Sequence, residues 1–563
     1  MNTSNLQAVW PGKLGRPTTA VWWSASGLLG MLCAGALGCA YACWLYSFGL
    51  LDGELPFWLR EGADTTQYLA GFNAFLREPW HWPLLRIESL NAPEGTLATF
   101  VDAIPLFAMV WKLFEHGPDT PFRNPFGIYL GLCFILQGVG AWWICREANT
   151  RQWPVLLAMT LLLVSFPALT FRIAHTSLMA QWLLLFALAI YLRGTARGRI
   201  ATWAWIALLP CAFYLNIYLF AMASALFAAD AWRQIRRGPA RPALIAAGGA
   251  AGLLLLTMCA TMLPLPGGAG SREWGFGFYS MNILAPLTGG NLLMFEHPLG
   301  TEGQGEGFNY LGVFVLALAG WGIYTKRRID PTFWRRHRPL LAMLVLLTLY
   351  ALSNAIYIGP VKLLSTKVPP MLDAVTSTFR SSGRFFWPVG YAVVVFAVLT
   401  AARHLSASRA ALVLAIVVAL QFWDLQPHHE RSRAAVAEST PPLIDAPRWQ
   451  AFLGPDIKAL NYYPPFRCGN APPSTGLLPT MLFAVKHNYA LSSGYIARAV
   501  KPCDHYDDEI ARLPATTAVV FDKAAFPKQE EADRLMGAGA RCADLGIGWV
   551  CRRDANHPME NKQ

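Results

Sequence analysis

Residues suited to chemistry are concentrated between the first hydrophobic segment and the later ones. Residues 52–102 hold eight acidic residues and three arginines, although the whole chain of 563 residues has a formal net charge of +12. The acidic residues are Asp52, Glu54, Glu61, Asp64, Glu78, Glu88, Glu94 and Asp102. Paired carboxylates serve as general acids and bases or bind metal ions, and ionisable groups at a membrane interface are functional candidates. The stretch is therefore expected to be an active-site loop.

Two further pairs of polar residues are candidates for binding a phosphate group. Arg172 and His175 stand at an expected outer turn between two apolar segments, where interfacial hydrogen bonding is the alternative role. Arg380 and Arg384 precede an apolar segment in a short outer loop, where the positive-inside rule disfavours arginine. A guanidinium group binds a phosphate at two points, and salt bridges to the acidic stretch are the alternative.

Both leading carboxylates also have structural interpretations. Asp64 is followed by Thr-Thr-Gln, which is typical of a capping box at the start of a helix over residues 67–76. This role and a catalytic one can coexist. Asp102 precedes Ala-Ile-Pro and is also expected to start a helix, and for this residue the structural role is favoured.

The outer loop that follows residue 290 contains further acidic residues, but a metal site is not expected there. The candidates are Glu296, His297, Glu302 and Glu306, and a second well-spaced histidine is missing. The glycine-rich residues 300–307 instead predict a mobile loop that could close over an outer cavity.

The composition indicates a polytopic α-helical membrane protein. Hydrophobic residues make up 54% of the chain and charged residues 14%, whereas soluble domains have about 25% charged residues. Residues 21–51 contain no charged residue or histidine, and about 20 such residues span a bilayer. The segment is too long for a removable signal peptide. It is expected to be a retained first helix after a cytoplasmic N-terminus, residues 1–20.

The basic residues form short clusters between apolar segments, which is the positive-inside pattern and argues against nucleic-acid binding. The clusters predict about eleven crossings, with the C-terminus on the periplasmic side of a bacterial inner membrane. Residues 104–114 are too short for a full span and are expected to be re-entrant or interfacial. Between residues 200 and 227, Pro210 and Asn216 predict two short half-helices that meet near Asn216, similar to the broken helices of transporters.

Polarity rises sharply near residue 425, so residues 425–563 are expected to form a small α/β domain outside the membrane. Its cysteines are Cys468, Cys503, Cys542 and Cys551. Four cysteines allow three pairings, and none of the spacings is a CxxC zinc pattern. Location in an oxidising compartment favours disulfides, and proximity along the chain favours Cys468 with Cys503 and Cys542 with Cys551.

Several motifs together resemble the GT-C superfamily of membrane glycosyltransferases and, more closely, a bacterial branch of domains of unknown function allied to it. The motifs are Asp64-x-x-Gln67-x-x-x-Gly71, Pro79-Trp80-x-Trp82-Pro83-Leu84, Asn91-x-Pro93-x-Gly95, Asp102-x-Ile104-Pro105-Leu106, Arg172-x-x-His175-x-x-Leu178, Gly277-Phe278-Tyr279-Ser280-Met281-Asn282, Glu306-Gly307-Phe308-Asn309-Tyr310-Leu311-Gly312 and Ser381-Ser382-Gly383-Arg384-Phe385-Phe386-Trp387. The resemblance covers most of a membrane domain at residues 21–424 and little of the C-terminal domain.

The resemblance implies transfer of a sugar from a polyprenyl-phosphate donor, bound from the membrane lipid, to a glycan, lipid or protein acceptor on the outer face. Asp64 matches the position of the superfamily's base or acceptor-orienting residue. Arg384, Arg380, Arg172 and His175 would stabilise the lipid-phosphate leaving group. The superfamily's frequent acidic doublet is missing, because Thr65 follows Asp64. The resemblance therefore implies no certain cofactor and does not establish a divalent metal requirement.

Two other functions fit the same sequence. A transporter or flippase for a lipid-linked saccharide would share the broken helices and the interfacial arginines, and a noncatalytic envelope assembly protein would also be polytopic. The acidic loop outside the membrane favours the enzyme, whereas charged residues buried in the middle of helices would favour a transporter.

Overall fold

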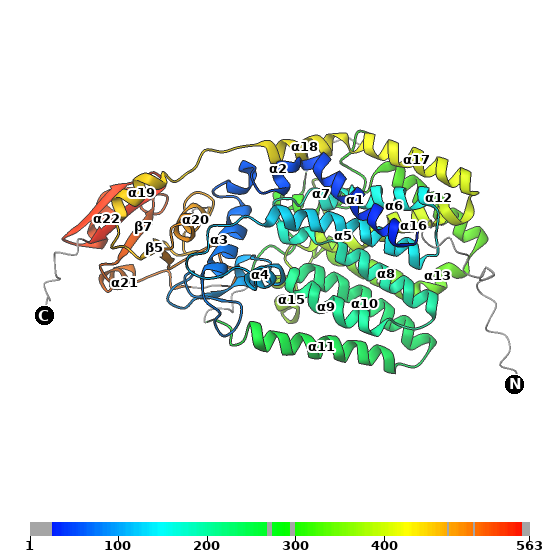
Figure 1. The fold of residues 1–563 in the computed structure, drawn as a ribbon, viewed down its shortest axis with the longest axis horizontal. Helices are drawn as coiled ribbons and strands as arrows, with labels where there is room; N and C mark the ends of the chain where they lie inside the picture. Colours follow the sequence, from blue (N-terminus) through cyan, green and yellow to red (C-terminus); the bar gives the residue numbers. More distant parts are fainter. Residues whose placement is uncertain (1–24, 267–272, 293–298, 470–471, 499–500, 554–563) are drawn as a thin grey trace.

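The computed structural model describes residues 25–266, 273–292, 299–469, 472–498 and 501–553. It is an elongated molecule in which a bundle of helices is followed, at one end, by a smaller region that contains a sheet (Figure 1). Seven helical segments of the described residues are long and apolar enough to cross a membrane. They are Leu28–Tyr46 (α1), Phe126–Glu147 (α5), Trp153–Thr170 (α6 and α7), Thr176–Arg197 (η4 and α8), Arg241–Thr261 (α11), Ser382–His404 (η7 and α16) and Ala407–Asp424 (α17). The number of about eleven crossings stays a prediction.

Small residues bring α1 and α5 into close contact. A Cβ atom on Gly38 would lie 2.1 Å from the carbonyl oxygen of Phe134, and one on Gly138 would lie 2.0 Å from that of Ala34. Only glycine permits backbones to approach this closely, and small residues at helix crossings are typical of membrane bundles. These two glycines therefore hold the first helix against the body of the protein.

The predicted helix break at Asn216 is confirmed. The helix α9 (Thr202–Leu215) ends there, and the Asn216 side chain caps α10 (Ile217–Arg237) by accepting a hydrogen bond from the amide of Tyr218 at 2.9 Å. The prediction of two short half-helices is wrong for the second, which has 21 residues. The part of α10 past residue 227 carries the buried Asp230 carboxylate, which pairs with Arg233 at 2.7 Å, so neither charge is left unpaired.

Short elements follow the first helix and form the acidic stretch. After α2 (Phe48–Leu51) and η2 (Pro56–Leu59) comes the helix α3 (Asp64–Arg77). The strands β1 (Arg86–Ile87) and β2 (Thr96–Leu97) pair antiparallel before η3 (Ala98–Val101). The helix α4 (Pro105–Lys112) has eight residues, which corresponds to about 12 Å at 1.5 Å per residue. It is too short to span a membrane, as predicted for this segment.

The outer segments between the later helices include η5 (Glu302–Gly307), the hairpin of β3 (Ala355–Ile358) with β4 (Val361–Ser365), η6 (Pro370–Leu372) and α15 (Asp373–Thr378). The helices α12 (Val313–Ile329), α13 (Thr332–Arg336) and α14 (Arg338–Leu352) lie between η5 and β3. The helix α18 (Gln426–Ala437) follows α17 and contacts α1, so the first polar helix after residue 425 still packs on the bundle.

The C-terminal region is a five-stranded mixed sheet with strand order β6-β5-β7-β9-β8. Its strands are β5 (Ala459–Tyr463), β6 (Ala490–Leu491), β7 (Thr517–Asp522), β8 (Ala540–Asp544) and β9 (Gly548–Arg553). Its helices are α19 (Ala446–Leu453), α20 (Leu477–Lys486), α21 (Tyr506–Ala511) and α22 (Gln529–Met536). Helices and strands therefore share one small α/β unit, as the sequence predicts.

Both predicted pairs of cysteines form disulfide bonds in this region. Cys468 is bonded to Cys503 and Cys542 to Cys551, with sequence separations of 35 and 9 residues. The second bond joins β8 to β9, where the two cysteines are directly paired across the strands. Closing loops of these lengths restricts the unfolded chain and stabilises a domain by about 2 to 4 kcal/mol per bond.

The C-terminal region is attached to the acidic stretch by main-chain contacts. The amide of Leu491 donates to the carbonyl of Ser89 at 2.7 Å, and the amide of Ala92 donates to the carbonyl of Leu491 at 3.0 Å. The helix α20 lies against α3, which Figure 1 shows between the bundle and the sheet. The acidic stretch is thus held between the two parts of the molecule.

Candidate active site

The centre of the candidate site is Glu306, the carboxylate that two arginines share. Its Oε2 accepts hydrogen bonds from Nη1 of Arg172 at 2.8 Å, and from Nε and Nη2 of Arg384 at 2.9 and 2.7 Å. Nε2 of His175 lies 3.7 Å from the second carboxylate oxygen. Burial alone would raise the pKa of Glu306, but Arg384 and Arg172 outweigh it and hold the pKa well below its ordinary value. We refer to Glu306, Arg172, Arg384 and His175 as the Glu306 cluster.

Arg172 is the more deeply buried of the two arginines that bind Glu306. Its side chain is 2% exposed, and its Nη2 also donates to the carbonyl of Glu306 at 2.5 Å. Burial lowers the pKa of Arg172 to about 10, so it stays charged at neutral pH. The phosphate-binding role considered for Arg172 does not fit this arrangement, because the guanidinium is enclosed and occupied by Glu306.

Arg384 is better placed to meet a ligand. It lies in η7 (Ser382–Phe386) at the start of the α16 segment, and its guanidinium carbon lies 4.8 Å from the ring centre of Tyr218. Glu306 accepts hydrogen bonds from Nε and Nη2 of Arg384 and, with the aromatic face, fixes the plane of the guanidinium, which leaves the Nη1 edge for a ligand. The Arg384 side chain is 11% exposed, whereas that of Arg172 is 2% exposed.

His175 connects the Glu306 cluster to the acidic stretch. Its Nε2 lies 3.2 Å from Oδ2 of Asp64. Burial, together with the positive charges of Arg384 and Arg172, lowers the pKa of His175 to about 4, against the opposing effects of Glu306 and Asp64. The ring is therefore neutral at pH 7, and a neutral ring that bonds the Asp64 carboxylate carries its proton on Nε2.

Asp64 is the first residue of α3, but it does not cap the helix. Ala63 occupies the N-cap position and no side chain caps the first turn, so the predicted capping box is wrong. The helix begins at Asp64 rather than at residue 67, and the carboxylate turns to His175 instead of the helix amides. Its side chain is 40% exposed, which leaves the carboxylate accessible from the outside.

Asp102 lies close to Asp64 and does not start a helix, so that prediction is also wrong. It ends η3 in a left-handed conformation with φ of 52°, and α4 begins later, at Pro105. Asp102 is exposed as a residue, and among the residues that the structure describes its carboxylate has no hydrogen-bond partner. Protein that surrounds the carboxylate raises its pKa to about 6, as does the charge of Asp64, against the opposing charge of Arg384. We refer to Asp64 and Asp102 as the acidic pair.

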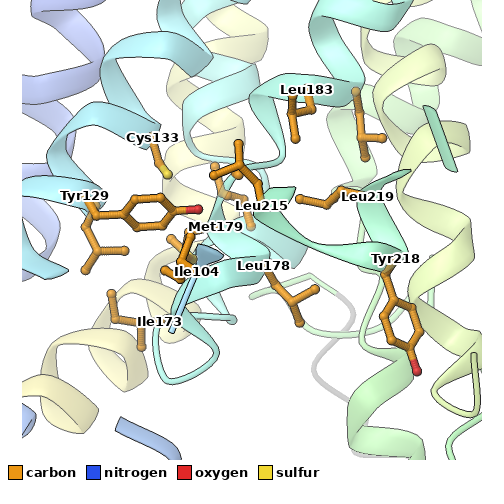
Figure 2. Packing of buried hydrophobic residues seen from close by; sticks show 14 of the residues in the cluster. Ile104, Tyr129, Cys133, Ile173, Leu178, Met179, Leu183, Leu215, Tyr218 and Leu219 are labelled. Atoms are coloured by element: carbon orange, nitrogen blue, oxygen red, sulfur yellow. The ribbon is translucent and has the colours of Figure 1, made fainter. Parts of the chain in front are cut away.

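Apolar residues next to the Glu306 cluster and the acidic pair in the sequence are closely packed. Figure 2 shows Ile104, Ile173 and Leu178 packed together with residues of the central helices, while Tyr218 lies at the edge of the cluster. Each of the three is one to three residues away from Asp102, Arg172 or His175 in the sequence. Because close-packed interiors deform little, this packing fixes the turns that carry the polar side chains.

Arg380 does not join the Glu306 cluster. Its guanidinium carbon lies 5.4 Å from the ring centre of Tyr279, and Nη1 donates to the carbonyl of Trp274 at 3.4 Å. The predicted pairing of Arg380 with Arg384 in one phosphate site is thus not reproduced, because the turn between them sends the two side chains to different neighbours.

The glycine-rich residues 300–307 are packed into the protein and form η5 rather than the predicted mobile loop. A Cβ atom on Gly307 would lie 2.4 Å from the carbonyl oxygen of Ser280, and the Asn309 side chain donates to the carbonyls of Gly307 and Gly383 at 2.9 Å. The glycines allow this close backbone approach, which delivers Glu306 to the two arginines.

The described residues contain no group of three or more His, Cys, Asp or Glu side chains that could hold a metal ion. Glu302 lies on the surface of η5, and Glu296 and His297 lie outside the described residues.

Two residues of the site were not identified from the sequence. Glu306 was considered only as a metal ligand, although it begins the Glu306–Gly312 motif, which was the available signal. Tyr495 comes from the C-terminal region, and its carbonyl accepts a hydrogen bond from Nε2 of Gln67 at 2.7 Å. Gln67 lies in the first turn of α3, which Asp64 begins. Burial raises the pKa of Tyr495, and Asp64 and Asp102 raise it further, against the opposing charge of Arg380. No sequence signal pointed to Tyr495.

Comparison with known proteins places the two parts of the chain in one family. Residues 35–426 match the family described as a domain of unknown function, DUF6311, and residues 448–553 match the DUF6311 C-terminal domain. No curated protein and no solved structure matches the chain. Since the first match covers well over half of the sequence, this chain belongs to the DUF6311 family.

Proposed function

We propose that this protein is a GT-C-like integral membrane glycosyltransferase. It transfers a sugar from a polyprenyl-phosphate donor to a glycan, lipid or protein acceptor on the periplasmic face of a bacterial inner membrane. The observation that carries the proposal is the contact between the acidic pair and the Glu306 cluster, which sets two solvent-accessible carboxylates beside a preset arginine at the ends of apolar helices.

The direction of the helices supports the periplasmic location. The α8 segment begins directly after His175 and ends with Arg197, and the α16 segment begins around Arg384 and ends with Arg403 and His404. Since basic residues mark the cytoplasmic ends of spans, the opposite ends, which carry the site, face the periplasm.

The chemistry requires a base and a stabilised leaving group. An acceptor hydroxyl attacks the anomeric carbon of the donor sugar, the bond from that carbon to the phosphate oxygen breaks, and the hydroxyl proton passes to a carboxylate of the acidic pair. Attack on the face opposite the phosphate inverts the anomeric centre. Arg384 stabilises the charge that develops on the lipid phosphate, because a preset cation needs no reorganisation during the reaction.

Within the acidic pair, the two carboxylates have different tasks. Asp64 is oriented by the neutral His175 and is the proposed base or acceptor-orienting group. Asp102 has no hydrogen-bonded partner in the part of the chain that is described, and it sets the negative potential at Asp64 and at the incoming hydroxyl.

Replacement of Arg384 by lysine tests the phosphate role. Lysine keeps the charge but cannot reproduce a planar two-point contact, so we expect binding of polyprenyl phosphate to weaken by about tenfold, the effect of losing one charge-assisted hydrogen bond. Binding is measured with purified protein in nanodiscs that contain polyprenyl phosphate.

The matched control for that experiment is Arg380→Lys, the same change on a nearby arginine that does not contact Glu306. Thermal unfolding of each variant separates loss of binding from loss of fold. If Arg384→Lys and Arg384→Ala both bind polyprenyl phosphate as tightly as the parent protein, the arginine serves structure alone and this proposal for its role is wrong.

Replacement of Asp102 by asparagine tests the acidic pair through pH. The raised pKa of Asp102, about 6, means that ionised Asp102 is present above this pH and is lost as the pH falls through it. We therefore expect the parent's transfer rate to fall below about pH 6. In Asp102→Asn the transfer rate should not show this fall below pH 6, and the rate at neutral pH should be lower than that of the parent protein.

The same variant has an opposite effect on stability. A carboxyl group whose pKa is raised by folding binds a proton more tightly in the folded state, so its ionisation destabilises the fold as the pH rises. Asp102→Asn should thus melt at the same temperature or higher at pH 7. A clearly lower melting temperature, with turnover unchanged, would assign Asp102 to structure.

A further inference from the structure

The C-terminal sheet has the topology of a ligand-binding α/β fold. The chain runs from β5 through α20 to β6 on one side of β5, and then through α21 to β7 on the other side. The three strands are parallel. In such sheets, ligands bind outside the carboxyl ends of the strands, at the point where the strand order reverses. Here that point lies between the ends of β5 and β7.

Different helices cover the two faces of this sheet, as a reversal of strand order requires. Alternate residues of β5, Leu460 and Tyr462, pack in the same core as α20, whereas Tyr463 packs in a second core with α21 and α22. The carboxyl ends of β5 and β7 therefore open between two layers of helices.

A crevice of about 140 Å³ lies at this point. Tyr462 near the end of β5 and Asp522 at the end of β7 line it, together with the start of α20 at Leu477. The other residues that line the crevice are mostly prolines. They are Pro464, Pro465, Phe466, Arg467, Gly469, Pro472 and Pro473. This volume is below the range of about 300 to 1,000 Å³ for drug-sized ligands, and it suits a single small ring.

The polar groups of the crevice suit a neutral ligand with hydroxyl groups. The hydroxyl of Tyr462 donates to Oδ2 of Asp522 at 2.5 Å, and the amide of Ala524 donates to Oδ1 at 2.8 Å. Arg467 is paired with Glu273. Because the carboxylate would repel an anion and the arginine is already neutralised, a phosphate is disfavoured. A sugar ring places its C–H face on aromatic and proline surfaces and its hydroxyls toward Asp522 and Tyr462.

Contacts of Phe466 connect this crevice to the acidic pair. Its ring centre lies 5.0 Å from that of Tyr495, and its amide donates to Oγ of Ser493 at 2.9 Å. The carbonyl of Tyr495 in turn accepts a hydrogen bond from Gln67 in the first turn of α3, the helix that Asp64 begins. One wall of the crevice is thus adjacent to the residue that borders the candidate active site.

We propose that the crevice between the ends of β5 and β7 binds a neutral sugar ring of the acceptor. The ring lies beyond the unit that reacts, so the C-terminal domain selects a saccharide acceptor and presents its hydroxyl to the acidic pair. The role of this sugar as an acceptor rests on the proposed glycosyltransferase function, whereas binding of a sugar in the crevice does not depend on that function.

Saturation-transfer NMR on the full-length protein in nanodiscs tests the inference. The probes are free glucose, galactose, mannose and N-acetylglucosamine in an equimolar mixture. At least one sugar should receive saturation through its ring C–H protons. Tyr462→Phe, which removes one hydroxyl, and Phe466→Leu, which removes one flat ring, should each weaken binding of that sugar by about three- to tenfold.

The matched control is Tyr489→Phe, the same change on a tyrosine that stacks on Phe483 and does not line the crevice. Thermal unfolding identifies any variant that loses its fold. If no sugar receives saturation, or if Tyr462→Phe and Phe466→Leu bind as the parent protein does, the crevice is not a sugar site.

The Asp64→Asn variant tests the proposed function separately from sugar binding. This variant should bind the sugar as the parent protein does while its transfer is lost. Sugar binding that depends on Tyr462, in a protein with no transfer from polyprenyl-phosphate donors, would support the crevice and overturn the transferase. Transfer without sugar binding in the crevice would support the transferase and overturn the crevice as a sugar site.

Discussion

Replacing Asp64 by asparagine should lower the transfer rate by roughly 10²- to 10⁴-fold, the usual contribution of a general base, while the protein remains folded. Asp64 contributes no cap to α3, and its bond to His175 at 3.2 Å can be kept by the amide oxygen of asparagine. The change therefore removes the proton acceptor and little else. The measurement is transfer of labelled sugar from a polyprenyl-phosphate donor at saturating substrate.

The matched control is Asp52→Asn, the same substitution at the start of the acidic stretch. Asp52 accepts a hydrogen bond from the amide of Glu54 at 3.1 Å, an exposed local contact, so this variant should transfer sugar normally. Normal turnover in Asp64→Asn would exclude Asp64 as the base. A parent protein that moves a lipid-linked saccharide across vesicles without transferring its sugar would point to the flippase instead.

Replacing Glu306 by glutamine should destabilise the fold by about 3 to 5 kcal/mol, the cost of leaving buried charges without a partner. Glutamine has nearly the same shape, but it cannot neutralise Arg172, which is 2% exposed, or Arg384, which is 11% exposed. Thermal and denaturant unfolding of the purified protein measure the loss. Transfer should also fall, because Arg384 loses the group that orients it.

The pH dependence of stability gives this prediction a second readout. The pKa of Glu306 lies well below its ordinary value, so its contribution to stability is present above the ordinary glutamate pKa of about 4.3 and is lost as the pH falls further. Glu306→Gln should be less sensitive to acid in this range. The control is Glu302→Gln, on the exposed side of the same short helix η5, and equal melting temperatures for the two variants would contradict the central role of Glu306.

Local patterns in the sequence were sufficient for features that depend on nearby residues. Long apolar runs located the helices, because a run of about 20 apolar residues predicts a membrane-spanning helix without knowledge of the rest of the chain. Asn216 marked a helix break because its side chain caps the next amides. The disulfide pairs followed from proximity along the chain, and the acidic composition of residues 52–102 identified Asp64 and Asp102.

The partners of the charged side chains depended on the tertiary structure. The sequence predicted an N-cap role for Asp64, but His175 lies within reach only because α3 meets η4 (Thr176–Met179), where the hydroxyls of Tyr68 and Ser177 lie 3.0 Å apart. Glu306 was placed in a mobile loop, because the sequence does not show that Gly307 and Gly383 allow η5 to approach the arginines.

The sequence alone therefore determined the long apolar helices, the helix break and the disulfide pairs, and it singled out the two carboxylates as candidates, since each depends on composition or on neighbouring residues. Only the tertiary structure decided which charges pair, that Arg380 stands apart from Arg384, and that Tyr495 of the C-terminal domain is bonded to the helix that Asp64 begins. The physical reason is that a buried charge must find its counter-charge in three dimensions, and the segments that supply it are far apart in the chain.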